Sequence, residues 1–378
     1  MAKSKSYLVI FLVVVFIYLI KSSLLQIIQK PLVSHSLQCK GEKSDWLEKI
    51  ASYSIQDLDY TNLQLSYIDP EGSKSTCIAG WKGLPYLSYK VNESTVFSYA
   101  SVTKVFTSEL VLDLVRRKRI NLDDKLVSFL TEINSKNLKD TRVSDISISD
   151  LLSHRAGFDS SLTPDTMVSS SPWCPYKIEI LQHTILDFEP DSKNIYSNLG
   201  YCLLALVIES VYSKNYLEVS QDYYHFNSSR VSFINQSPIA YPSIPNINYS
   251  KYLNDLDFFA LSSVGGLSGT SEELSQYVYS MDRQTHPNIT SLPNNIRCDV
   301  KNVRSCHGFS SYEYAPNKSL TIYWRDGRLP NTSALVIMDS EGGVLAFLSA
   351  SENKLSWLST HNQLVKRIYN SFLKLYDD

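Results

Sequence analysis

The sequence predicts an α+β fold in which strands from both ends of the chain meet in one sheet around a helical middle. Two short stretches toward the N-terminal end, 63–67 and 96–99, are predicted strands. Three more, 320–324, 333–339 and 344–350, follow one another near the C-terminal end with turn residues between them. Helical spacing dominates the residues between the two groups. This segregated order is typical of α+β chains rather than of alternating α/β chains.

The first helices are predicted from apolar spacing and from their end signals. Between Ser101 and Arg119 the apolar residues recur at helical spacing, and basic residues close the last turn, where the helix dipole favours them. A short helix at 150–157 is expected to end at Gly157 in the left-handed conformation. A strongly apolar helix is expected at 201–212.

The segment after that apolar helix is predicted to be irregular. Residues 213–260 are rich in Ser, Asn, Pro and Tyr and are expected to form long surface loops. The glycine pair at 265–266 is expected to form a tight turn. Thr270 and Glu273 then have the spacing of a capping box at the start of a helix. A last helix is expected at 355–375.

The composition is that of an ordinary folded protein. The chain has 378 residues, 43% of them hydrophobic and 20% charged, which excludes a disordered chain, collagen and a multi-span membrane protein. The formal net charge is −2, from 36 Lys and Arg against 38 Asp and Glu, so no basic excess points to a nucleic-acid partner. The cysteines and histidines do not have zinc-site spacing, so no metal site is predicted.

Residues 1–28 are expected to be a signal peptide or a signal anchor. Lys3 and Lys5 precede the uncharged run 7–20, which is the form of a secretory signal. A helix of that length rises about 21 Å, less than the ~30 Å hydrocarbon core. The apolar character resumes at 24–28, however, so an uncleaved anchor is an equal alternative, and a buried strand is a third. A cleaved signal peptide predicts a secreted protein, and an uncleaved anchor predicts a single-pass type II membrane protein.

Sequons and cysteines agree with an oxidising, secretory compartment. Seven N-x-S/T sequons predict a glycoprotein. They lie at Asn92, Asn227, Asn235, Asn248, Asn288, Asn317 and Asn331. Six cysteines in such a compartment predict disulfides. Cys298 with Cys306 is the preferred pair and Cys39 with Cys77 a second one, whereas Cys202 is expected either in a disulfide or as a free thiol in the core.

The tetrad at 101–104, Ser-Val-Thr-Lys, has the form S-x-x-K. Ser351 and Ser371 begin the same pattern, so the pattern alone carries little weight. Ser101 differs because it opens a long helix directly after a strand, with Lys104 one turn further on the same face. A lysine whose pKa is lowered by burial or by a nearby cation can activate the hydroxyl as a nucleophile. The plain alternative is a helix-capping serine followed by an exposed lysine.

The second motif is Tyr196-Ser197-Asn198, of the form Y-x-N. Tyr60 and Tyr252 begin the same pattern. A phenol at this place could pass a proton between nucleophile, leaving group and water, and the amide beside it could bind substrate. The plain alternative is an amphipathic tyrosine that caps the following helix.

The order of the motifs resembles the serine β-lactamase and penicillin-binding protein superfamily. After the tetrad at 101–104 come Leu-Leu-Ser-His-Arg-Ala-Gly at 151–157, Tyr-Ser-Asn-Leu-Gly-Tyr at 196–201, and Gly-Gly-Leu at 265–267 ahead of a capped helix. The chain looks most like the branch of class C β-lactamases and D-alanyl-D-alanine carboxypeptidases, which includes animal β-lactamase-like proteins. The resemblance covers about 55–375.

The resemblance implies a fold and a domain arrangement. It implies a β-lactamase/transpeptidase-like architecture, with an antiparallel sheet, flanking helices and an all-helical lobe at about 120–280, and with the site between the lobes. Residues 55–375 would then form the domain, and 29–54 would be a linker behind the N-terminal segment.

The resemblance also implies roles for residues. Ser101 would be the acylated nucleophile, Lys104 and Tyr196 its partners in proton transfer, and Asn198 the contact to a substrate amide. His154 belongs to a segment that is usually architectural in this family and receives no catalytic role. No metal or organic cofactor is implied.

The third family motif departs from its usual form. The family has K-T-G or H-x-G on the strand beside the site, and here Arg325-Asp326-Gly327 stands there. Arg325 keeps a positive charge that could bind a substrate carboxylate, but it does not exchange protons as His does. Asp326 is expected to offset that charge. The backbone N–H of Arg328 would complete an oxyanion hole with that of Ser101, while its side chain is expected to crowd the site.

These observations predict a secretory-pathway serine hydrolase that acts on an ester or amide through an acyl-enzyme on Ser101. A small ester, a peptide or an acyl-amino acid is a better expectation for the substrate than a β-lactam. The alternative is a catalytically impaired, membrane-tethered glycoprotein that uses the fold for binding or assembly, and the altered third motif motivates it. The sequence makes no prediction of oligomeric state.

Overall fold

The structure is a computed structural model that describes most of the chain in several stretches. These are residues 29–163, 165–169, 171–234, 256–285, 305–307, 311–314, 316, 320–329, 332–351 and 357–377. The expected signal or anchor at 1–28, five of the seven sequons and Cys298, with its expected disulfide, lie outside the described residues. Within the described stretches, no helix has both the length and the hydropathy to cross a membrane.

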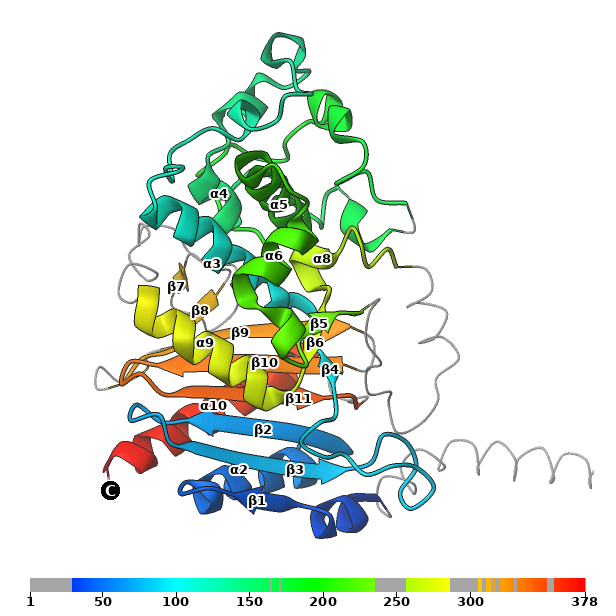
Figure 1. Cartoon of the computed structure of the whole chain (residues 1–378), viewed down its shortest axis with the longest axis vertical. Helices are drawn as coiled ribbons and strands as arrows, with labels where there is room; N and C mark the ends of the chain where they lie inside the picture. Colours follow the sequence, from blue (N-terminus) through cyan, green and yellow to red (C-terminus); the bar gives the residue numbers. More distant parts are fainter. Residues whose placement is uncertain are drawn as a thin grey trace, which may run out of the picture.

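An eight-stranded antiparallel sheet forms one end of the molecule (Figure 1). Its strand order is β1-β3-β2-β11-β10-β9-β8-β7. The strands are β1 (Gln38–Lys40), β2 (Asn62–Ile68), β3 (Lys74–Gly80), β7 (Ser305–His307), β8 (Ser311–Tyr314), β9 (Ile322–Leu329), β10 (Thr332–Asp339) and β11 (Val344–Ser349). Because β2 pairs with β11, the predicted meeting of both ends of the chain in one sheet is confirmed.

Both faces of the central strands are buried. Along β10, Ala334 and Val336 belong to the core on the helical-lobe side, while Leu335 and Ile337 belong to the core on the opposite side. This follows from the two-residue period of a strand, which turns successive side chains to opposite faces. The sheet therefore separates two hydrophobic cores.

Two helices from opposite ends of the chain cover one face of the sheet. They are α2 (Ser44–Gln56) and α10 (Trp357–Asp377). They contact each other, and Trp46 Nε1 donates to the backbone oxygen of Ser371 at 2.9 Å. Leu47 and Ile50 of α2 are fully buried, because the apolar stripe of this helix lies in the core. Residues 29–54, expected to be a linker, instead contain β1 and most of α2 and are part of the fold.

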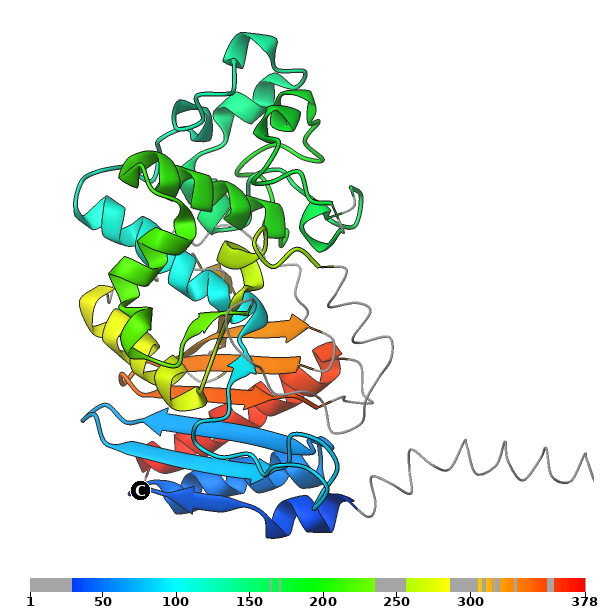
Figure 2. The same cartoon turned by 45° about the vertical axis from the view of Figure 1, so that its right-hand side comes forward.

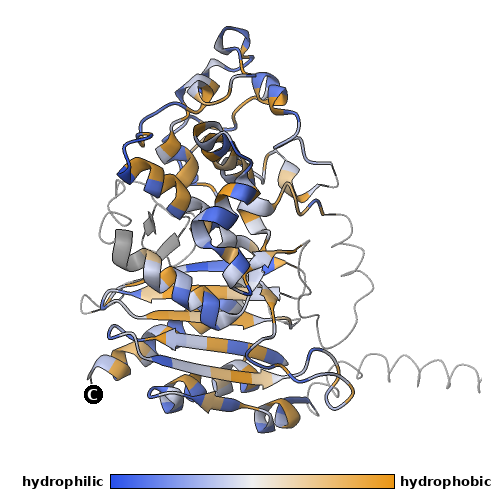
Figure 3. Ribbon diagram, viewed as in Figure 1, coloured by the Kyte–Doolittle hydropathy of each residue, from blue (hydrophilic) through white to orange (hydrophobic). Residues whose placement is uncertain are grey.

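The opposite face carries α9 and the helical lobe (Figure 2). Helix α9 (Ser271–Thr285) packs on β2 and β11, and the hydroxyls of Ser275 and Ser66 lie 2.8 Å apart across this contact. The lobe comprises α3 (Thr103–Arg116), α4 (Ile148–Leu152), α5 (Asn198–Tyr212), α6 (Tyr216–Tyr224) and α8 (Ser262–Gly265) with short 3₁₀ turns. Helix α5 is apolar over most of its length (Figure 3) and lies in the middle of the lobe's core.

Several local predictions are confirmed and others are corrected. The Thr270 hydroxyl lies 3.0 Å from Glu273 Oε2 and accepts from the Glu273 backbone N–H, so the capping box is present. The region 213–260, expected to be all loop, contains α6 and the strand β5 (Ser232–Phe233). The sequence did not reveal α6 because its apolar face consists largely of tyrosines, such as the buried Tyr216. The short helix expected to run to Gly157 ends at Leu152.

Two disulfides are present in the described residues. Cys39 and Cys77 are directly opposed on β1 and β3 and are bonded, as predicted. Cys202, on α5, is bonded to Cys174, so the alternative of a free thiol at Cys202 is wrong. Disulfides persist in oxidising compartments, which supports an extracytoplasmic location for the folded domain.

Candidate active site

Ser101 lies at a sharp turn between a strand and a helix. The strand β4 (Phe97–Ser98) pairs with β6 (Leu267–Gly269) in a small second sheet and is followed by a 3₁₀ turn, η1 (Ala100–Val102), that continues into α3. Ala100 has a φ of 44°, in the left-handed region that costs a non-glycine residue about 1 kcal/mol or more. This turn brings the half-buried Ser101 to the base of α3, as its sequence context predicted.

The three predicted catalytic side chains meet at this point. Ser101 Oγ lies 2.8 Å from the Tyr196 hydroxyl and 3.2 Å from Lys104 Nζ. Tyr196 lies just before α5, far from Ser101 in the sequence. The structure therefore brings together a hydroxyl, an amine and a phenol within hydrogen-bonding distance, as the mechanism required.

Lys104 is fully buried, and its environment favours the neutral amine. Burial lowers the pKa of Lys104 well below its usual value, and the positive charge of Arg325 lowers it further. The negative charge of Asp165 acts in the opposite direction with a smaller effect. The alternative of an exposed lysine beside a capping serine is thus wrong for this position.

The hydrogen bonds of Lys104 determine which neighbour can give it a proton. Nζ donates to Asn198 Oδ1 and to the backbone oxygen of Val264, each at 2.8 Å. Both oxygens are acceptors only, so a neutral amine uses its two N–H groups on them and keeps its lone pair for the third neighbour. That neighbour is the hydroxyl of Ser101, which is the arrangement a general base needs.

Asn198 connects Lys104 to a residue that sequence analysis did not single out. Its Oδ1 accepts from Lys104 and, at 3.0 Å, from the Tyr196 hydroxyl. Its Nδ2 donates to Asp165 Oδ2 at 2.6 Å. Because a carboxylate only accepts, Asp165 fixes the orientation of the Asn198 amide. Asp165 lies in an irregular segment with no recognisable motif, so only its proximity in the fold reveals it.

Tyr196 is surrounded by cationic and aromatic groups. The guanidinium carbon of Arg325 lies 4.8 Å from the centre of its ring, Lys104 Nζ lies 5.0 Å away, and the His154 ring lies 4.6 Å away. Burial, with the charges of Arg325 and Lys104, lowers the pKa of His154 well below its usual value. His154 Nδ1 accepts from the backbone N–H of Ser197 at 3.2 Å, so this side chain supports the segment that carries Tyr196.

The third motif lies on β9, directly against η1. A Cβ atom at Gly327 would lie 2.9 Å from the backbone nitrogens of Ser101 and Val102 and would overlap the backbone oxygen of Tyr99. Glycine is therefore required for this close approach. Arg325 Nε donates to the backbone oxygen of Ser101 at 3.3 Å, and its side chain is only 3% exposed.

Asp326 and Arg328 lie on the face of β9 that is turned away from Ser101, which corrects the expectation that Arg328 crowds the site. Asp326 faces the other side of β9, where its Oδ2 lies 3.3 Å from Nδ1 of His361 on α10. Burial alone would raise the pKa of Asp326, but hydrogen bonding to His361 and the charges of His361 and Arg325 lower it. Arg328 is exposed and, by strand alternation, shares the face of Asp326, so its side chain does not crowd Ser101. The role of its backbone N–H stays a prediction.

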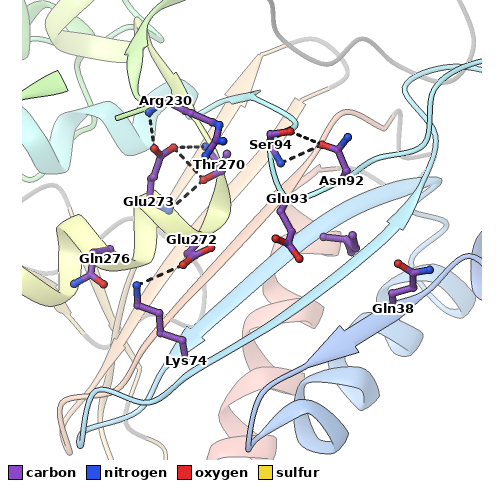
Figure 4. A pocket seen from close by; sticks show the side chains of 11 residues that line it. Gln38, Lys74, Asn92, Glu93, Ser94, Arg230, Thr270, Glu272, Glu273 and Gln276 are labelled. Atoms are coloured by element: carbon purple, nitrogen blue, oxygen red, sulfur yellow. Dashed lines mark hydrogen bonds and ion pairs between the residues drawn. The ribbon is translucent and has the colours of Figure 1, made fainter. Parts of the chain in front are cut away.

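A separate polar groove lies at the other end of the small sheet (Figure 4). It has a volume of about 620 Å³ and contains none of the predicted site residues. Two of its carboxylates already have partners within the groove: Glu272 pairs with Lys74 at 3.4 Å, and Glu273 accepts from the backbone N–H of Arg230 at 2.5 Å. In the described part of the chain, no group of three His, Cys, Asp or Glu side chains is arranged to hold a metal ion.

Comparison with known proteins gives a consistent result. The family model described as Beta-lactamase matches residues 82–224. The chain is 31% identical over 329 residues to the probable fimbrial assembly protein FimD, serogroup H1, of Dichelobacter nodosus, covering 84% of this chain and 82% of the relative. It is 30% identical over 128 residues to a putative D-alanyl-D-alanine carboxypeptidase of Escherichia coli (strain K12), covering 32% of this chain and 30% of the relative.

A solved structure agrees at the level of the fold. D-amino acid amidase from Ochrobactrum anthropi SV3, complexed with L-phenylalanine, superposes with a TM-score of 0.69 at 15% identity, covering 88% of this chain and 98% of that chain. The β-lactamase/transpeptidase-like fold predicted from the sequence is thereby confirmed. The chain belongs to the serine β-lactamase and penicillin-binding protein superfamily, whose members include serine hydrolases such as amidases and carboxypeptidases.

Proposed function

We propose that the protein is a serine hydrolase that cleaves an ester or amide through an acyl-enzyme on Ser101. The observation that carries this proposal is the position of Ser101 Oγ, within hydrogen-bonding distance of both the Tyr196 hydroxyl and Lys104 Nζ. A serine hydroxyl is a weak nucleophile unless a base lies beside it. Lys104, buried and with a lowered pKa, is that base.

The proposed reaction has two stages. Lys104 accepts the proton of Ser101 as Oγ attacks the substrate carbonyl, and the backbone N–H groups of Ser101 and Arg328 stabilise the oxyanion. Lys104 then passes this proton through Tyr196, which contacts Ser101, to the leaving group as the scissile bond breaks. In the second stage water attacks the acyl-enzyme and loses a proton to Tyr196 and Lys104, which deliver it to Ser101 Oγ as the acyl bond breaks. No metal or organic cofactor takes part.

The proposed substrate is small and carries a carboxylate beyond the scissile bond. Arg325 is the reason, because its guanidinium contacts both the backbone of Ser101 and the ring of Tyr196. Guanidinium groups bind carboxylates through paired hydrogen bonds. Gly327 lets β9 lie directly against η1, which places Arg325 beside Ser101. A peptide or an acyl-amino acid fits this arrangement better than a β-lactam.

The proposed location is outside the cytosol, either secreted or held at a membrane by residues 1–28. The two disulfides support an oxidising compartment, and the charge pattern of the N-terminal segment supports export. Glycosylation at the sequons is part of this proposal where the host cell modifies such sites.

A second candidate function is binding or assembly without catalysis. The relatives named as fimbrial assembly proteins favour it, because one of them is similar over 84% of this chain. The replacement of the usual Lys or His by Arg325 in the third motif also favours it. A chain that folds normally but does not react at Ser101 would support this candidate.

The test is covalent labelling of the purified protein with a fluorophosphonate probe, read by intact mass. We expect one probe per chain in the wild type and none in Ser101→Ala. Ser371→Ala is the matched control, because Ser371 also begins an S-x-x-K pattern, and it should label like the wild type. Absence of labelling in a folded wild-type protein that also turns over no ester would reject the hydrolase and leave the assembly function.

A further inference from the structure

Asp165 places a negative charge next to Asn198, the residue that contacts both Lys104 and Tyr196. It precedes a 3₁₀ turn, η5 (Thr166–Val168), and its Oδ1 accepts from the backbone N–H of Met167 at 2.9 Å. Its Oδ2 accepts from Asn198 Nδ2 at 2.6 Å. The side chain is partly exposed. Each oxygen of a carboxylate can accept two hydrogen bonds, so both oxygens of Asp165 retain capacity for a further donor.

Asp165 changes what Asn198 offers to a substrate. The resemblance to the family gave Asn198 the task of binding a substrate amide, which requires its Nδ2 to donate to a carbonyl oxygen. Here one N–H of Nδ2 donates to Asp165, and the second N–H remains for a substrate carbonyl. A substrate that also brings a positively charged donor can in addition pair with the Asp165 carboxylate next to this amide.

The charges around Ser101 are arranged with opposite signs. Arg325 on β9 and Asp165 before η5 both act on Lys104, the first lowering and the second raising its pKa. They approach the reaction centre from different elements, because Arg325 contacts Tyr196 and the backbone of Ser101, whereas Asp165 contacts Asn198. A substrate that satisfies both charges carries a cation on one side of the scissile carbonyl and an anion on the other.

We propose that Asp165 binds the free ammonium group of the substrate, which narrows the substrate class proposed above to short peptides with an unblocked N-terminus. Amino-acid amides and esters carry the ammonium group without the carboxylate and therefore report on the Asp165 site alone. This inference rests on the proposed hydrolase function. An ammonium group supplies up to three donors and a positive charge to the carboxylate. An N-acylated substrate replaces that cation with a neutral amide and loses the ion pair.

The experiment compares alanine p-nitroanilide, which has a free ammonium group, with N-acetyl-alanine p-nitroanilide, each as D- and L-enantiomer. Assays are run at about pH 6.5, where an α-amino group of pKa about 7.7–8.0 is protonated. We expect the wild type to prefer the free-ammonium substrate roughly ten- to hundredfold in kcat/KM, the range for a hydrogen bond to a charged group. In Asp165→Asn the two substrates should become equivalent to within about threefold, and Asp165→Glu should recover part of the preference.

The control is Asp222→Asn on α6, whose carboxylate pairs with Lys214 and contacts no site residue, and it should keep the wild-type preference. If Asp165 only positions Asn198, its removal will slow both substrates by the same factor, and that result overturns the proposal. Equal turnover of both substrates by the wild type also overturns it, as does a protein that reacts with the fluorophosphonate probe but with neither anilide. Failure of the probe itself to label Ser101 rejects the hydrolase function instead, and the inference with it.

Discussion

Burial and Arg325 both lower the pKa of Lys104, while Asp165 raises it, and the proposed chemistry depends on this balance. Lys104 acts as a base only when it is deprotonated, so the rate of acylation rises with pH through the pKa of this amine. Burial and the neighbouring charges together therefore set the pH above which the proposed base is deprotonated.

Arg325→Met should move the low-pH limb of the acylation rate to higher pH, because removing the cation raises the pKa of Lys104. Asp165→Asn should move the same limb to lower pH, because removing the anion lowers that pKa. The measurement is the rate of labelling by an uncharged fluorophosphonate between pH 4 and 9. Lys104→Met is the control, and it should react on the order of 10³-fold more slowly at every pH. Shifts in the same direction for both charge variants would contradict the assignment of Lys104 as the base.

Among single residues, the sequence predicted that Ser101, Lys104 and Tyr196 come together, but not that Asp165 lies next to them. Ser101 and Tyr196 stand in motifs whose order along the chain is informative even without a structure. Asp165 is one acidic residue in an irregular segment, and only the fold brings it to Asn198. Asp326 shows the same limit, because its contact with His361 on α10 also depends on the fold and was not predicted from the sequence.

At the scale of elements, the site depends on the close approach of β9 to η1. Gly327→Ala should slow acylation on the order of 10²-fold, because the added methyl group displaces the backbone of Ser101 by a large part of an ångström. It should also lower the free energy of unfolding by about 1–3 kcal/mol, the usual cost of overpacking. The measurements are probe labelling and urea unfolding.

Gly83→Ala is the matched control for this substitution. A Cβ at Gly83 would meet only the side chain of Ser88, at 3.2 Å and 3.3 Å, so both measured quantities should stay near the wild-type values. Wild-type labelling by Gly327→Ala would show that the contact between β9 and η1 does not position the nucleophile.

The elements that sequence analysis predicted are those with a strong apolar period. This holds for strands β10 and β11 and for helices α3 and α5. Because these elements are buried along most of their length, apolar residues recur along most of their sequence. Helix α2 was missed although its buried residues recur at helical spacing, because most of its segment was assigned to a linker outside the family resemblance. Helix α6 was missed because tyrosines, which also suit loops, form its buried side.

At the scale of the whole molecule, the two disulfides have different relations to the site. Cys174–Cys202 connects the segment that follows Asp165 to α5, the helix that begins at Asn198. Cys39–Cys77 connects β1 to β3 at the far edge of the sheet. The first therefore stabilises both the fold and the pairing of Asp165 with Asn198, whereas the second stabilises the fold alone.

Replacing Cys174 and Cys202 together by Ala should lower the free energy of unfolding by about 2–4 kcal/mol, as expected for loops of this size. It should also reduce the preference for a free ammonium group, because Asp165 is held less firmly. The matched variant, Cys39 and Cys77 both replaced by Ala, should lose similar stability and keep the wild-type preference. The measurements are urea unfolding and the kcat/KM ratio of the two anilides. An unchanged kcat/KM ratio in the variant without Cys174 and Cys202 would show that this disulfide does not affect substrate selection.

The pairing of β2 with β11 also governs how the protein is made. Synthesis makes β2 and β3 long before β11, because most of the domain lies between them in the sequence. Until β11 follows, the edge of β2 exposes unsatisfied backbone donors and acceptors, which invites association with other chains. Pairing over so long a separation is also slow. Shielding this edge before β11 arrives would therefore limit aggregation of the newly made chain.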